Sequence, residues 1–146
     1  MRQKLIYPVI ATLLFAATAC NTGRHSSAGF RLPDNGDPAR GRAAFLALGC
    51  NHCHSVSGVD MPAPTVQPPV PVVLGGDVAN EITDGYLVTS IINPNYQLAS
   101  YPNEQITAGG MSRMPAHTSD ITVQQLTDIV AFLQSRYTVR RLPPPK

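Results

Sequence analysis

The sequence predicts a mainly α fold of short helices joined by ordered, proline-rich loops. Fourteen prolines and eleven glycines among 146 residues argue against long helices, because proline removes a backbone donor and fixes φ. With 43% hydrophobic and 14% charged residues, the chain is too apolar to be disordered, and its length fits one domain. The aromatic supply is thin, with four phenylalanines, five tyrosines and no tryptophan. We therefore expect something other than side chains to fill part of the core.

The N-terminus has the pattern of an export signal over residues 1–19. Arg2 and Lys4 give a positive start, and the apolar stretch from Val9 ends in small residues directly before Cys20. That stretch is far shorter than the ~20 residues that span a bilayer as a helix. The small residues before the cysteine resemble a bacterial lipoprotein signal, in which cleavage precedes Cys20 and its thiol receives lipid. Cleavage without lipidation is the alternative interpretation.

A flexible tether is predicted over residues 20–36, which are rich in Thr, Gly, Ser and Asn. The ordered domain is expected at 37–140. Asp37 and Pro38 predict the start of its first helix, because Asp is a favoured N-cap and Pro is favoured at the first helical position. Gly49 predicts the end of that helix.

The middle of the chain, residues 55–76, contains many of the prolines and shows no helical periodicity. We expect an ordered extended loop here rather than a linker, because its apolar side chains need burial: Val66, Val70, Val72, Val73 and Leu74. A short helix should begin at Thr83 and end before Pro94. Residues 95–115 have the composition of another loop.

The last helix is the element that the sequence predicts most directly. Thr122 and Gln125 form a capping-box pattern. Apolar residues follow at helical spacing, at Leu126, Ile129, Val130, Leu133 and Tyr137. Three prolines in residues 141–146 prevent continuation and leave a proline-rich tail. No internal repeat and no strand of convincing length is apparent.

The run Cys50-Asn51-His52-Cys53-His54 matches the attachment pattern of c-type haem, two thiols three positions apart and then a histidine. Each thiol can add to a haem vinyl group, and one turn of backbone can place two thiols at the separation of the two vinyls. The imidazole of His54 would then serve as the proximal iron ligand through Nε2. Export supports this interpretation, because bacteria attach haem covalently outside the cytoplasm. We expect one covalent haem c.

Three other interpretations of the two thiols compete. A zinc site needs two further ligands, but Cys20 directly follows the signal and His25 lies in the tether. A thioredoxin-like dithiol needs a βαβ setting, whereas here a helix precedes the motif and a proline-rich loop follows it. A disulfide between Cys50 and Cys53 would close a very small loop and leave His54 unexplained.

Several segments around this motif resemble the small monohaem c-type cytochromes with His/Met ligation. They are residues 41–45, 63–66, 112–115 and 128–133, within a resemblance that covers about residues 37–137. The resemblance implies a cytochrome c-like fold wrapped around covalent haem, whose first and last helices cross near the haem edge. By that resemblance Gly41 and Phe45 should meet Ile129 and Phe132.

Met114 is the sixth ligand that the resemblance implies, in a loop shortly before the last helix. Pro115 after it favours an extended conformation, which helps to project a thioether toward a metal. Core filling is the ordinary alternative role of a methionine. Met111 and then His117 are the next candidate ligands, whereas Met61 is expected too near the proximal side.

The second nitrogen of His54 needs a hydrogen-bond acceptor to fix the ring. Pro64 lies at the position that matches the family, so its carbonyl oxygen is the expected acceptor. Arg113 or Tyr101 could reach a haem propionate, with a solvated surface role as the alternative for both.

Two axial ligands fill the iron, so the expected function is one-electron transfer rather than catalysis, with redox proteins as partners. The carrier would be held by lipid on the periplasmic side of a bacterial membrane. The alternatives are a haem c subunit of a larger membrane dehydrogenase or terminal oxidase, and an open-site haem enzyme or gas sensor. The sequence has no long basic run, which argues against nucleic-acid binding.

Overall fold

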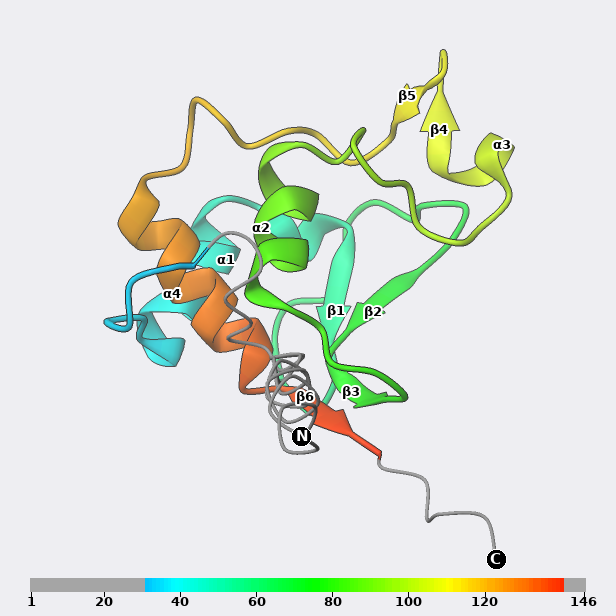
Figure 1. Cartoon of the computed structure of the whole chain (residues 1–146). Helices are drawn as coiled ribbons and strands as arrows, with labels where there is room; N and C mark the ends of the chain where they lie inside the picture. Colours follow the sequence, from blue (N-terminus) through cyan, green and yellow to red (C-terminus); the bar gives the residue numbers. More distant parts are fainter. Residues whose placement is uncertain (1–30, 141–146) are drawn as a thin grey trace, which may run out of the picture.

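A computed structural model describes residues 31–140, and within them it contains four α-helices, one 3₁₀ turn and six short strands (Figure 1). The helices are α1 (Pro38–Ala47), α2 (Asp84–Ile92), α3 (Asn103–Ile106) and α4 (Val123–Gln134), and the 3₁₀ turn η1 is Cys50–His52. The strands are β1 (His54–Val56), β2 (Val72–Leu74), β3 (Gly76–Val78), β4 (Thr107–Ala108), β5 (Met111–Ser112) and β6 (Tyr137–Val139). The predicted export signal, Cys20, the first part of the tether and the tail at 141–146 lie outside the described residues.

The strands form three separate pairs. β1 pairs with β2 and β3 with β6, both in parallel, whereas β4 and β5 form an antiparallel hairpin. Each strand has only two or three residues, which explains why alternation along the sequence did not reveal them. Helices therefore build most of the core, and the strands hold the loops between them.

The predicted starts of the main helices are confirmed, but α4 ends at Gln134, so Tyr137, which was expected on its apolar face, lies in β6 instead. The carboxylate of Asp37 accepts hydrogen bonds from two backbone N–H groups at the start of α1, and Pro38 occupies its first turn. The Thr83 hydroxyl caps α2, and Thr122 with Gln125 forms the complete capping box of α4. These signals are local, so they could be recognised without tertiary structure.

α1 crosses α4 at a very close approach (Figure 1). A Cβ added to Gly41 would lie 1.9 Å from the Asp128 carbonyl oxygen and 2.7 Å from the Phe132 Cβ, so only glycine fits. The rings of Phe45 and Phe132 meet edge to face at 5.8 Å between centroids. The contact expected between the first and last helices is confirmed.

A buried carboxylate, that of Asp128, ties the start of α1 to α4. Asp128 is 3% exposed, and its oxygens accept hydrogen bonds from the Asp37 backbone N–H, the Arg40 guanidinium and the Gln124 amide. The hydrogen bond from Arg40 is the main reason why the pKa of Asp128 falls from 3.8 to about 2. The charged form is therefore favoured by folding.

Asp128→Asn should lower the free energy of unfolding by roughly 1.5–3 kcal/mol, because the charge that Arg40 pairs with is lost and an NH2 group replaces one of the two accepting oxygens. The folded pKa is below the unfolded one, so the contribution is present above about pH 4 and is lost as pH falls through about 2. Denaturant unfolding at several pH values measures both effects. Asp77→Asn is the control, because the Asp77–Arg140 pair is exposed and worth at most about 1 kcal/mol. Equal losses in the two variants would contradict this account of Asp128.

Residues 31–36, which the sequence placed in the flexible tether, instead pack on the domain. Leu32 is 7% exposed and belongs to the core. A Cβ on Gly36 would lie 2.8 Å from the Cβ of Ala131, so the backbone here touches α4. The polar composition of the segment concealed this single buried leucine, and the tether prediction is wrong for residues 31–36.

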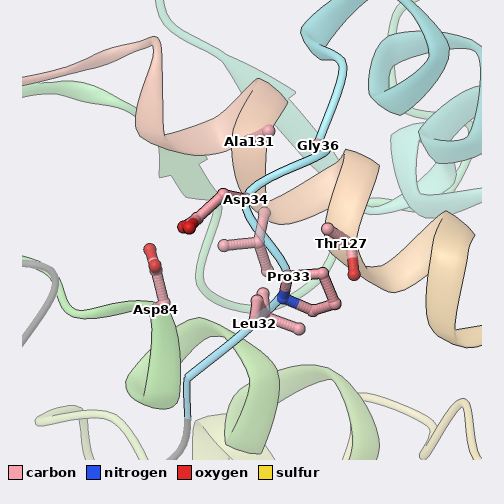
Figure 2. Close-up of a pocket in the computed structure, with 8 residues that line it drawn as sticks. Leu32, Pro33, Asp34, Gly36, Asp84, Thr127 and Ala131 are labelled. Carbon is pink, nitrogen blue, oxygen red and sulfur yellow. The ribbon is translucent and has the colours of Figure 1, made fainter. Parts of the chain in front are cut away.

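A pocket lies between this segment, the start of α2 and α4 (Figure 2). The carboxylates of Asp34 and Asp84 face it from the segment and from α2, and Thr127 and Ala131 line it from α4. Asp84 is not free, because its Oδ1 accepts a hydrogen bond from the Gln134 amide.

The apolar side chains of the middle loop are buried only in part. Val66 and Val73 are 52% and 58% exposed, whereas Val70, Val72 and Leu74 are half-buried. In β2 the side chains alternate between the two sides of the strand, so Val73 faces solvent while its neighbours face inward. The expectation that all five would be buried is wrong for Val66 and Val73.

The predicted loop at 95–115 contains α3 and the β4–β5 hairpin, which project from the rest of the domain (Figure 1). Gly109 and Gly110 form its turn at φ +59° and +80°, a conformation that glycine adopts without strain. Within residues 31–140, no helix has both the length and the apolar character needed to cross a membrane.

Candidate haem site

The two thiols of the motif lie on one tight turn after α1. Gly49 has φ +72°, and the backbone N–H groups of His52 and Cys53 donate to the carbonyls of Gly49 and Cys50 at 2.9 and 3.3 Å. The turn is η1, and it brings Cys50 and Cys53 together directly before β1. Both cysteines are free thiols.

The state of these thiols distinguishes between the competing interpretations. Cys50 and Cys53 are not joined in a disulfide. Partial burial raises the pKa of Cys50 to about 11, so its thiol stays protonated at neutral pH. A dithiol that exchanges disulfides depends on a lowered pKa, which argues against a thioredoxin-like role.

A zinc site finds no support in the part of the chain that the structure describes. Among residues 31–140, no three His, Cys, Asp or Glu side chains are grouped so that they could hold a metal ion. Closed structural zinc sites use four such ligands.

His54 is oriented by the pairing of β1 with β2. Its register partner is Val72, and His54 Nδ1 lies 3.1 Å from the Val72 carbonyl oxygen. A carbonyl only accepts, so Nδ1 carries the proton and the neutral ring keeps its lone pair on Nε2. Burial lowers the pKa of His54, which favours this neutral form. The imidazole is therefore held in the tautomer that an Nε2 metal ligand needs.

The acceptor for His54 is Val72 and not Pro64, so the expectation for Pro64 is wrong. Pro64 is exposed, in a loop whose Val66 N–H donates to the His52 carbonyl at 2.9 Å. The long proline-rich loop returns to the histidine only at β2. The β-branched residues Val72 and Val73 before Leu74 favour a strand. Its register against β1, which places Val72 opposite His54, depends on the tertiary fold and cannot be seen in the sequence.

Met114 lies half-buried in the segment that runs from the β4–β5 hairpin past the end of α2 to α4 (Figure 1). Its backbone N–H donates to Ser112 Oγ at 3.1 Å. Met111, the second candidate ligand, is 61% exposed in β5. Met61 is half-buried against the hydrophobic core.

His117 follows Met114 by three positions and has partners of its own. Its Nδ1 lies 2.9 Å from Asp120 Oδ2, and its backbone N–H donates to the Ile91 carbonyl at 3.1 Å. The hydrogen bond from His117 lowers the pKa of Asp120. Burial is the main cause that raises the pKa of Cys50, and the negative charge of Asp120 adds to this rise.

The candidate propionate partners are both on the surface. Tyr101 is 43% exposed, and the Arg113 side chain is exposed while its backbone N–H donates to the Ile106 carbonyl. No role for Asn95 was apparent from the sequence, yet its side-chain Oδ1 accepts a hydrogen bond from the backbone N–H of Ser112 at 2.7 Å. An asparagine after proline signals a turn, but its partner seventeen residues away could not be seen.

The side chains at this turn fit covalently attached haem. Two free thiols lie on one turn, and the adjacent imidazole is neutral with Nε2 unprotonated. A half-buried methionine lies in the loop before α4.

Comparison with known proteins agrees with this fit. The sequence model of the Cytochrome c family matches residues 38–136, more than half of the chain, from the start of α1 to the end of α4. Neither the curated protein sequences nor the solved structures that we searched contained a match. Members of the matched family bind haem c covalently and use its iron in electron transfer. With its α1–α4 crossing and its Cys-X-X-Cys-His turn inside the matched range, the chain belongs to the cytochrome c family.

Proposed function

We propose that the protein is a one-electron carrier with a single haem c, attached at Cys50 and Cys53 and ligated by His54 and Met114. The observation that carries this proposal is the state of His54. Its Nδ1 is committed to the Val72 carbonyl, so the lone pair on Nε2 is the one available to a metal. The bound iron would supply the ferrous–ferric couple.

Each residue has a separate task in this proposal. The thiols of Cys50 and Cys53 form thioethers, so the cofactor stays attached throughout the redox cycle. The β1–β2 pairing fixes the His54 ring, which limits ligand rearrangement between oxidation states. The thioether of Met114 is a weak donor that favours ferrous iron and raises the reduction potential. With His54 and Met114 both bound, the iron would have no position left for a substrate.

Carbon monoxide binding tests this function. The chemically reduced protein should bind carbon monoxide slowly or not at all, because Met114 must leave first. A redox titration followed by the visible spectrum should fit a reversible one-electron step. Rapid binding of carbon monoxide would show an open iron site and would favour an enzyme or gas sensor instead.

We further propose that lipid on Cys20 holds the carrier at the periplasmic side of a bacterial membrane, where redox proteins are its partners. The small residues before Cys20 support this. Cys20→Ser should move the protein from the membrane fraction to the soluble fraction, and mass spectrometry of the wild-type N-terminus should find a lipidated Cys20. An unmodified N-terminus at another residue would contradict lipidation. Stable co-purification with a larger oxidoreductase would make the carrier a subunit of that complex.

A further inference from the structure

The segment that contains Met114 is fastened at one end to the turn that follows α2 and at the other end to the last turn of α2 itself. On one side, the backbone N–H of Ser112 donates to Asn95 Oδ1 at 2.7 Å. On the other, the backbone N–H of His117 donates to the Ile91 carbonyl at 3.1 Å. Met114 lies between these two attachments, which connect its loop to a helix of the core.

The attachment at Ser112 extends directly to Met114. Ser112 Oγ accepts the backbone N–H of Met114 at 3.1 Å, while the backbone N–H of Ser112 is held by Asn95. Ser112 also pairs with Thr107 in the β4–β5 hairpin, and the N–H of Arg113 donates to the Ile106 carbonyl at 2.9 Å. A short chain of hydrogen bonds therefore runs from Asn95 through Ser112 to the backbone of Met114.

Asn95 is itself part of a hydrogen-bonded turn. Pro94 is buried directly after α2, and the backbone N–H of Tyr96 donates to the Asn93 carbonyl at 3.0 Å, which closes a turn around Pro94 and Asn95. The N–H of Asn93 donates to the Thr89 carbonyl at 2.8 Å and joins this turn to the last turn of α2. Although the Asn95 side chain is exposed, its backbone is thus fixed to the core.

We propose that Asn95 is a positioning residue for Met114, which acts through Ser112 to keep the thioether on the iron. The inference rests on the proposed ligation by Met114. A thioether is a weak donor, so exogenous ligands such as imidazole can displace it from the iron. How well Met114 resists this displacement depends on how closely the loop keeps its sulfur in the binding position. Loss of the Asn95 acceptor leaves the hairpin in place but frees the backbone of Ser112 on the α2 side.

Titration of the ferric holoprotein with imidazole tests this role. The titration is monitored by the weak red-edge absorption band of methionine-bound iron, which disappears as imidazole replaces Met114. Asn95→Ala should bind imidazole roughly three- to tenfold more tightly than wild type, as expected for one lost hydrogen bond. Asn95→Asp keeps an acceptor at the same place and should stay close to wild type. Asn80→Ala, at an exposed asparagine before α2, is the matched control and should not change the affinity.

A second pair of variants tests the same chain at its next member. Ser112→Ala removes the acceptor for the Met114 N–H and should increase imidazole affinity, whereas Ser112→Thr keeps a hydroxyl and should restore it. This pair decides the matter if Asn95→Ala does not fold. A lower thermal midpoint with unchanged imidazole affinity would show a merely structural role and would overturn the proposal.

Failure of the inference can be distinguished from failure of the proposed function. If the wild-type protein lacks the red-edge band, the assignment of Met114 fails, and the role of Asn95 fails with it. If the band is present but Asn95→Ala and Asn80→Ala bind imidazole equally well, Met114 remains the ligand and only the role of Asn95 is wrong.

Discussion

The double variant Cys50→Ala/Cys53→Ala should contain no covalently bound haem. Both thiols are free, Cys50 at the start of η1 and Cys53 directly after it, and residues 31–140 contain no other cysteine that could replace them. Extraction with acidified acetone should leave haem in the wild-type polypeptide and remove all of it from the variant. The same result should appear as loss of haem staining on a denaturing gel.

The double variant should also lose its cooperative thermal transition. The chain has nine aromatic residues, counting phenylalanine and tyrosine, and no tryptophan, so the cofactor is expected to supply much of the core. Cys20→Ser is the control, because it removes the remaining cysteine and should keep full haem content. Haem that survives extraction in the double variant would refute attachment at these thiols, and cooperative melting like that of wild type would refute the role of the cofactor in folding.

Local chemistry explains which parts of the fold could be predicted. The caps of α1, α2 and α4 depend on residues within one turn, so Asp37, Thr83 and Thr122 were visible in the sequence. The thiol turn is also local, since Cys50 to His54 are consecutive. The contact between Gly41 and α4 followed from the family resemblance and not from periodicity.

The parts that could not be predicted depend on pairings between distant residues. The acceptor for His54 was expected at Pro64, ten positions on, but the loop returns only at Val72, eighteen positions on. The register of two three-residue parallel strands leaves no signal in either strand alone. Leu32 was missed for the same reason, since one leucine in a polar segment has no periodicity.

Asn95 shows the same limit within the site. Its sequence neighbourhood, after Pro94, predicts a turn, and the structure contains that turn. That its amide oxygen would meet Ser112 depends on the α3–hairpin excursion between them. Residues that position a ligand through the backbone are therefore harder to find than the ligands, whose chemistry is visible in their side chains.

Met114→Ala should lower the reduction potential by about 0.1 V or more, within the ~0.8 V range over which axial ligands set haem potentials. The thioether favours ferrous iron, so its removal destabilises that state. The red-edge band should vanish, and the iron should become open to water, carbon monoxide or imidazole. Covalent haem content should stay near that of wild type, because attachment depends on Cys50 and Cys53. Spectra, carbon monoxide binding and a redox titration of one preparation measure all four effects.

Met111→Ala is the matched control for this prediction, because Met111 precedes Met114 by only three positions but is 61% exposed in β5. Its removal should leave the band and the potential unchanged. His117 remains the third candidate ligand, because the pairing of its Nδ1 with Asp120 leaves Nε2 available, as the Val72 carbonyl does for His54. If Met111→Ala removes the band and Met114→Ala does not, the ligand assignment is wrong, yet a methionine-ligated carrier remains. If neither substitution changes the spectrum, no methionine in this loop binds the iron. Ligation by Met114 and the positioning role of Asn95 are then both wrong.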